Sequence, residues 1–178
     1  MKFETIQSQL IYQGRVFSLQ VDEVRLPDGN TARLDIINHG GGIAIVPLDD
    51  QGNILFVRQY RQPAKTTLLE LPAGALKPGE YPEDTARREI REETGMAAEK
   101  LLLLSEFFLA PGYSTEYMYI YLATGLSPAP LQGDEDEFIT VEAVPVKRAY
   151  AMLENGELQD SKTMLGLYLA SPHLKDKK

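Results

Sequence analysis

Three glutamates near the C-terminal end of one predicted helix are the residues in this sequence best suited to chemistry. Segment 79–95 has a glycine at each end, with Pro82 suited to the first turn, and is predicted to be a helix. Glu89, Glu92 and Glu93 lie in its last turn and a half. Carboxylates at this spacing repel one another, and the negative end of the helix dipole disfavours them further. We therefore expect a compensating positive charge beside them.

The helical periodicity indicates that two of these glutamates face inward. At about 100° per residue, Glu89 and Glu93 share a face with small and apolar residues, which is the face a helix normally packs against the core. Glu92 borders this face, and Arg88 precedes it by four residues and can pair with it. The opposite side is predicted to carry Asp84, Arg87, Arg88 and Arg91. Desolvating two or three carboxylates together is costly unless a cation neutralises them.

The composition restricts which cation this is. The sequence has no cysteine and only two histidines, His39 and His173, so thiolate sites and a histidine-rich zinc site are excluded. Oxygen ligands alone favour Mg²⁺ or Mn²⁺ over zinc. The alternative is a solvated acidic helix end balanced by arginines, which is what most charge runs are.

The spacing of the fixed residues favours the metal site. Gly74 is followed by Glu80, and then by the run R-E-I-R-E-E-T-G-M at residues 88–96. This pattern resembles the Nudix box, G-x5-E-x7-R-E-U-x-E-E-x-G-U, in which U is aliphatic. The resemblance implies a hydrolase that cleaves a nucleoside diphosphate linked to another group, using a divalent metal and water. It implies metal-binding roles for Glu89, Glu92 and Glu93, an orienting role for Arg88, and a role for Glu80 in holding the loop to the helix.

Further segments resemble the ADP-ribose pyrophosphatase branch of this family. Residues 70–74 resemble its E-[LI]-P-A-G motif, which implies that the Ala73 carbonyl also binds metal. Residues 57–61 match V-R-Q-[YF]-R, which implies that Arg61 contacts the pyrophosphate. Arg58 is the other candidate on this strand, but it is three residues away and so faces the opposite side.

Three more segments add candidate residues by the same resemblance. Segment 111–116 resembles P-G-[FY]-[ST]-x-E, and segment 134–137 matches an acidic loop whose glutamates reach the catalytic centre in that branch. Segment 12–16 resembles an N-terminal strand motif; in that branch the N-terminal sheet is exchanged across a homodimer and helps to build the substrate pocket. The residues implied are Arg15, Pro111, Gly112 and Glu116 for substrate and Glu135 and Glu137 for catalysis.

The function expected is Mg²⁺-dependent hydrolysis of ADP-ribose to AMP and ribose 5-phosphate. The acceptor of the water proton stays open among Glu92, Glu135 and Glu137. One alternative is another nucleoside diphosphate sugar, such as GDP-mannose. A second is a non-catalytic ADP-ribose sensor, which the intact box disfavours.

The rest of the chain is expected to position this helix. Polar and apolar residues alternate in short runs over 4–38, with a P-D-G-N turn at 27–30, and this predicts a small antiparallel sheet. Strands are predicted at 43–48, 54–60, 66–72, 101–108, 116–125 and 138–144, and helices at 147–156 and 160–171. We expect an α/β (α+β) sandwich with a mixed sheet, divided into an N-terminal part at 1–40, suited to dimerisation, and a catalytic part at 41–178.

Bulk properties exclude several classes of partner. The net charge is −8, with 26 acidic and 18 basic residues, and a nucleic-acid partner requires a basic surface instead. The N-terminus has no apolar run after its lysine, so no signal peptide is predicted, and no run reaches the length of a membrane span. We expect a cytoplasmic protein that acts on a small molecule.

Overall fold

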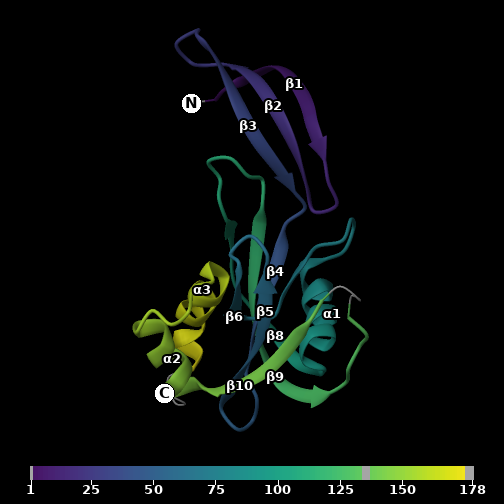
Figure 1. Cartoon of the computed structure of the whole chain (residues 1–178), viewed down its shortest axis with the longest axis vertical. Helices are drawn as coiled ribbons and strands as arrows, with labels where there is room; N and C mark the ends of the chain where they lie inside the picture. Colours follow the sequence, from purple (N-terminus) through teal and green to yellow (C-terminus); the bar gives the residue numbers. More distant parts are fainter. Residues whose placement is uncertain (1, 134–136, 175–178) are drawn as a thin grey trace. The chain divides into compact units, whose positions relative to one another are not determined.

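A computed structural model describes residues 2–133 and 137–174, and its N-terminal part is a three-stranded antiparallel sheet (Figure 1). The order is β1 (Glu4–Gln13), β2 (Phe17–Arg25), β3 (Thr31–His39). Arg25 of β2 pairs with Thr31 of β3, and Gly29 has a φ of 89° in the turn between them. Glycine adopts this left-handed conformation without steric cost, which explains the predicted turn at 27–30.

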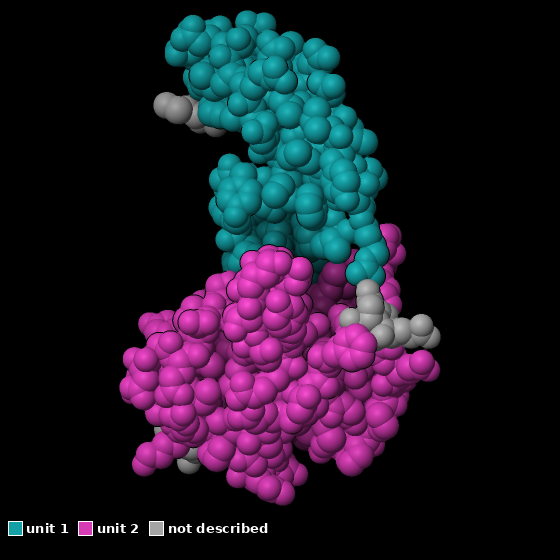
Figure 2. Space-filling model, viewed as in Figure 1, with its two compact units in different colours: residues 1–42, 107–118 teal, residues 43–106, 119–178 magenta. Residues whose placement is uncertain are grey.

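The chain divides into two compact units (Figure 2). Unit 1 comprises residues 1–42 and 107–118, and unit 2 comprises residues 43–106 and 119–178. Unit 1 therefore adds a later segment to the N-terminal sheet, and the Pro111–Gly112 turn belongs to it. The separate roles expected for 1–40 and 41–178 stay a prediction.

Two further sheets carry the rest of the strands. One has the order β10 (Ile139–Pro145), β5 (Asn53–Arg61), β6 (Thr66–Glu70), and its pairings are antiparallel. The other has the order β7 (Ala73–Ala75), β4 (Gly42–Pro47), β9 (Tyr117–Pro128), β8 (Met96–Phe108). Two elements differ from expectation here: β7 follows the predicted strand 66–72, where no strand was predicted, and β8 begins at Met96 and not near residue 101.

The helices of unit 2 are α1 (Pro82–Thr94), α2 (Val146–Glu154) and α3 (Ser161–Ala170), followed by the short 3₁₀ helix η1 (Ser171–His173). In Figure 1, α1 lies on one side of the strands of unit 2, and α2 and α3 lie on the other. The predicted sandwich is therefore confirmed. Within the described ranges, no helix is long and apolar enough to cross a membrane.

Helix α1 is held by its ends and by its apolar face. Pro82 occupies the first turn, and Gly95 ends the helix at a φ of 72°, where its N–H donates to the Arg91 carbonyl. Ala86 and Ile90 are completely buried and pack in one cluster with Ile43, Ile45, Tyr121 and Ala123. These contacts fix the rotation of the helix about its axis, and so they decide where its glutamates point.

Candidate active site

Two glutamates of α1 are buried with its apolar face. Glu89 and Glu93 are each only 8% exposed, and their neighbours Thr85, Ala86 and Ile90 are fully buried. The inward orientation predicted from the helical periodicity is therefore confirmed. Glu92 is half-buried at the edge of this face.

Arg88 lines the outer side of α1 with Asp84, Arg87 and Arg91, as predicted, but its guanidinium is bound by glutamates. Its Nη1 donates to Glu89 Oε1 at 2.6 Å and to Glu92 Oε2 at 2.7 Å. Its Nε and Nη2 donate to the two carboxylate oxygens of Glu80 at 3.0 and 3.1 Å. The long side chain bends back over the helix, so one guanidinium joins three glutamates, including the predicted Glu92 partner.

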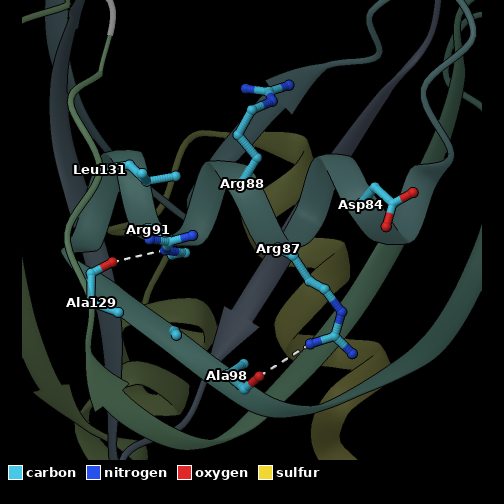
Figure 3. A pocket seen from close by; sticks show the side chains of 8 residues that line it. Asp84, Arg87, Arg88, Arg91, Ala98, Ala129 and Leu131 are labelled. Atoms are coloured by element: carbon cyan, nitrogen blue, oxygen red, sulfur yellow. Dashed lines mark hydrogen bonds between the residues drawn. The ribbon is translucent and has the colours of Figure 1, made fainter.

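The outer side of α1 borders a groove of about 390 Å³ whose lining includes Arg87, Arg88 and Arg91 (Figure 3) but not Glu89 or Glu93. Figure 3 shows Arg88 pointing away from Arg87 and Arg91. Arg87 donates to the Ala98 carbonyl and to Glu83, and Arg91 donates to the Ala129 carbonyl. These two arginines tie α1 to neighbouring backbone, so the groove is not the site of the glutamate chemistry.

The chain before α1 lies directly against the two buried glutamates. The Ala73 N–H donates to Glu93 Oε2 at 3.1 Å. A Cβ added to Gly74 would lie 2.0 Å from the Glu89 carboxyl carbon, so any side chain there would displace that carboxylate. The structure thus brings the predicted residue Ala73 together with Glu89 and Glu93. The close approach explains why position 74 is glycine.

Burial makes the two carboxylates poor places for uncompensated negative charge. Burial raises the pKa of Glu89, and Arg88 only partly opposes this. The pKa of Glu93 is raised to about 8, first by burial and then by the negative charge of Glu89, whose effect exceeds the opposing effect of the Ala73 N–H. The charge of Glu137 acts in the same direction on both. A cation beside them would reverse these effects.

The donor set fits a hard divalent cation. It consists of oxygen atoms only, two of its carboxylates are buried, and they repel one another. Among the residues that the structure describes, no three acidic or histidine side chains are arranged to hold a metal ion. The carboxylates are hydrogen-bonded instead: Arg88 donates to Glu89 and Glu92, and the Ala73 N–H donates to Glu93.

The two arginines of β5 have different partners. Arg61 donates from Nε and Nη2 to the two carboxylate oxygens of Glu70, both at 2.8 Å. Arg58 lies 2.5 Å from Glu142 of β10 instead. The structure does not bring Arg58 to the glutamates of α1, whereas the Glu93 charge acts on Arg61 and contributes to raising its pKa, after the Glu70 hydrogen bonds.

Sequence reasoning missed a cluster on the other side of Glu70. Glu70 is only 1% exposed, and Lys162 Nζ lies 3.7 Å from its Oε2 and 2.6 Å from Asp160 Oδ1. Asp160 caps α3 by accepting from the Thr163 N–H at 2.9 Å. The sequence does indicate part of this cluster, because Asp160 is the first residue of the predicted helix 160–171 and stands three residues before Thr163.

The remaining predicted residues lie in unit 1, near the glutamates of α1, or outside the described ranges. Arg15, Pro111, Gly112 and Glu116 belong to unit 1, and Glu116 Oε1 lies 3.9 Å from His39 Nδ1. Glu137 is exposed in the segment before β10, and its charge acts on Glu89 and Glu93, so the structure brings it near them. Glu135 falls outside the residues that the structure describes. The substrate and catalytic roles of these residues stay predictions.

Comparison with known proteins places this site in a family. The NUDIX domain matches residues 38–166, and a nucleoside diphosphate sugar hydrolase N-terminal domain matches residues 3–32. An ADP-ribose pyrophosphatase of Bacillus subtilis (strain 168) is 40% identical over 162 residues, which cover 90% of this chain and 88% of that protein. A methanol dehydrogenase activator of Bacillus methanolicus is 37% identical over 166 residues, covering 92% and 90%.

Two proteins of lower sequence identity also align with nearly all of this chain. A GDP-mannose pyrophosphatase of Yersinia pestis (strain Pestoides F) is 31% identical over 191 aligned positions, covering 97% of this chain and 93% of that protein. A crystal structure of an ADP compounds hydrolase superimposes with a TM-score of 0.87 at 24% identity, covering 99% of this chain and 96% of the other. That structure shares the fold. Since the NUDIX domain spans well over half of the 178 residues and carries the glutamate helix α1, the chain belongs to the Nudix hydrolase family.

Proposed function

We propose that this protein hydrolyses the pyrophosphate bond of ADP-ribose, giving AMP and ribose 5-phosphate, with Mg²⁺ as cofactor. The observation that carries the proposal is the pair of buried carboxylates, Glu89 and Glu93, packed against Ala73 and Gly74. The full-length relative in Bacillus subtilis, which bears the name ADP-ribose pyrophosphatase, supports the choice of substrate.

The proposed roles of the site residues are metal binding and the positioning of the metal ligands. Glu89 and Glu93, with the Ala73 carbonyl and with Glu92 at the edge, would hold the divalent ion. When bound, the ion neutralises pyrophosphate charge and lowers the pKa of water. Arg88 holds Glu89 and Glu92 at fixed places on the helix through its Nη1 group. Glu80 in turn holds the other edge of that guanidinium.

Arg61 would bind the anionic substrate. Its Nε and Nη2 are engaged by Glu70, which fixes the plane of the guanidinium. Among the described residues nothing else accepts from its Nη1, so these hydrogens are left for a phosphate oxygen. In the reaction, water oxygen forms a bond to phosphorus and the bridging P–O bond breaks. The water proton passes to a carboxylate, for which Glu92, Glu135 and Glu137 are the candidates.

A coupled phosphatase assay tests the proposal. An added phosphatase releases phosphate from AMP and ribose 5-phosphate but not from intact ADP-ribose. With Mg²⁺ we expect turnover of ADP-ribose to exceed that of GDP-mannose, NADH and diadenosine polyphosphates by at least about tenfold, which corresponds to about 1.4 kcal/mol in transition-state binding. EDTA should abolish it.

The same assay separates the alternatives. Preference for GDP-mannose would keep the metal chemistry but replace the substrate, in line with the relative of that name at 31% identity. Tight binding of ADP-ribose without turnover would indicate a sensor, and it would contradict the proposed enzyme.

We also propose that the protein acts as a homodimer through unit 1. Every residue of β1 is exposed, and the N-terminal sheet and its turns carry an unusual number of exposed apolar side chains. They are Phe3, Ile6, Leu10, Ile11, Tyr12, Val16 and Phe17. Large apolar side chains exposed on one small sheet support an interface between chains.

A further inference from the structure

The N-terminal end of α3 contacts the segment that leads into the glutamate site. The Leu71 N–H donates to the Thr163 hydroxyl at 2.8 Å, and both residues are almost completely buried. Leu71 follows Glu70 directly, and Lys162 of the same helix turn lies beside the Glu70 carboxylate. Two adjacent residues of α3 therefore hold two adjacent residues of the chain before β7.

The Thr163 hydroxyl can take only one orientation in this arrangement. An amide N–H donates only, so the hydroxyl oxygen must accept from Leu71, and its own hydrogen points to Asp160 Oδ2 at 2.7 Å. Asp160 is itself fixed, because Lys162 binds its Oδ1 and the Thr163 N–H donates to its Oδ2. Although burial raises the pKa of Asp160, the Lys162 charge and the Thr163 hydrogen bonds together hold it below its ordinary value.

The side chain of Leu71 also packs against α3. It is only 1% exposed, and a Cβ added to Gly166 of α3 would lie 2.5 Å from its Cδ1. Gly166 thus makes room for Leu71 against the helix. Backbone and side chain of one residue are both held by α3.

The three residues after Leu71 connect it to the glutamates of α1. The Pro72 carbonyl accepts from the Ile45 N–H of β4 at 2.9 Å, and the Ala73 N–H donates to Glu93 at 3.1 Å. Gly74 then lies against the Glu89 carboxylate. The three backbone groups thus go to three different elements, α3, β4 and α1. A shift at Leu71 would therefore move the Ala73 carbonyl relative to both glutamates.

We propose that Thr163, oriented by Asp160, is a positioning residue for the metal site, because it fixes through Leu71 where Ala73 and Gly74 meet Glu89 and Glu93. The proposal rests on the proposed function in that it assigns the site a divalent metal. It assigns Thr163 no contact with metal or substrate. Replacing a residue that orients the metal ligands without binding the metal itself typically lowers metal affinity on the order of 10- to 100-fold.

The test compares three variants in Mn²⁺ binding, measured by titration of the free protein without substrate. Thr163→Val keeps the shape but removes the hydroxyl, and Thr163→Ser keeps the hydroxyl. Tyr150→Phe is the matched control. It removes a buried hydroxyl of α2 that donates to the Leu167 carbonyl of α3, the helix that carries Thr163, at 2.7 Å. This control loosens α3 without touching Leu71. Hydrogen exchange of the Leu71 amide and urea unfolding are measured on each variant.

We expect Thr163→Val to weaken Mn²⁺ binding on the order of tenfold and to speed exchange of the Leu71 amide. Thr163→Ser should restore both to within about twofold of wild type. Tyr150→Phe should lower the urea midpoint as Thr163→Val does, yet leave Mn²⁺ affinity within about twofold. If Thr163→Val binds Mn²⁺ like wild type, or if Tyr150→Phe weakens binding equally, Thr163 has only a structural role and the proposal is wrong.

Two further measurements keep this test independent of folding and of the substrate. If Thr163→Val does not fold, Asp160→Ala removes the oxygen that orients the Thr163 hydroxyl, and it should weaken Mn²⁺ binding in the same direction. Unchanged affinity in that variant would overturn the proposal. If the wild type binds Mn²⁺ but does not hydrolyse ADP-ribose, the proposed substrate fails, and the comparison of variants still decides the role of Thr163.

Discussion

Arg88 and Glu80 show how single residues of the motif act on one another. The guanidinium of Arg88 donates to Glu80, Glu89 and Glu92, and its side chain is only 18% exposed. One cation thus offsets part of the repulsion among the glutamates of α1, but it cannot neutralise three carboxylates. The remaining negative charge is what a divalent ion would compensate.

The first prediction concerns Glu89. In the coupled phosphatase assay, Glu89→Gln should lower turnover at least about 100-fold, because a neutral amide no longer supplies the charge that holds the metal, which is worth several kcal/mol in the transition state. Glu83→Gln is the matched control, since Glu83 is an exposed glutamate of the same helix bonded to Arg87. It should retain activity within about twofold. Equal losses in both variants would contradict the role assigned to Glu89.

The second prediction concerns the pH dependence of stability. The hydrogen bonds from Arg88 lower the pKa of Glu80 from an ordinary value of 4.5 to about 2. An acidic group whose pKa is lower in the folded state than in the unfolded state stabilises the fold at pH values above the unfolded-state pKa. This contribution is therefore lost as the pH falls from about 4.5 to about 2. Glu80→Gln should therefore lower the free energy of unfolding by about 2–3 kcal/mol at pH 7 and by nearly nothing below pH 2.

Urea unfolding at pH 7, 5, 3 and 2 measures this difference. Glu157→Gln serves as the control, because Glu157 also pairs with an arginine, Arg148, but in an exposed position. Solvent screens such a pair, so its loss should change stability much less. A Glu80→Gln difference that stays constant from pH 7 to pH 2 would show that the ion pair is not its cause.

The element that completes the site is the short strand β7 rather than α1 alone. Helix α1 supplies the carboxylates, and the segment before it brings the Ala73 backbone and Gly74 against them. The two elements are joined by the loop at 76–81, which Glu80 ties back to Arg88 and to the Lys77 N–H at 3.3 Å. The position of each glutamate therefore depends on the loop as well as on the helix.

The third prediction tests this approach of β7 to α1. Gly74→Ala should lower turnover by about 100-fold, because the added Cβ would displace the Glu89 carboxylate, and a shift of about 1 Å can cost that much. Stability should fall as well, because Glu89 is buried and the displaced carboxylate would lose its hydrogen bond from Arg88. Turnover in the coupled assay and urea unfolding measure the two effects. Full activity of Gly74→Ala would contradict the close packing at Glu89.

At the scale of the whole molecule, the two units differ in what they offer a partner. Unit 2 contains the buried clusters around α1 and α3. Unit 1 has a sheet whose strand β1 is exposed along its full length. A sheet this small buries little apolar surface of its own, so association with a second chain is the expected way to stabilise it.

The fourth prediction is that sedimentation equilibrium gives a mass about twice the 19.9 kDa of one chain. Leu10→Asp, on β1, should reduce it to one chain, because a charge in an apolar interface is costly to desolvate. Leu102→Asp is the control, since Leu102 is a similarly exposed leucine of β8 in unit 2. It should leave the mass unchanged. A wild-type mass of 19.9 kDa would contradict the dimer.

The sequence by itself determined the family, the sandwich and the inward orientation of Glu89 and Glu93. Each depends on local information: the spacing of the box, the alternation of the strands, and the helical period that places these glutamates with Ala86 and Ile90. The N-terminal hairpin could be predicted for the same reason, because its turn requires glycine.

Only the tertiary structure decided how distant segments meet at the site. No local pattern indicates that Thr163 holds Leu71, 92 residues earlier, or that Lys162 lies beside Glu70. The spacing of four predicted the pairing of Arg88 with Glu92, but not the further contacts of its guanidinium with Glu80 and Glu89, which depend on where the loop before α1 lies. Hydrogen bonds between distant segments depend on packing in three dimensions, and that packing is set by the whole core at once.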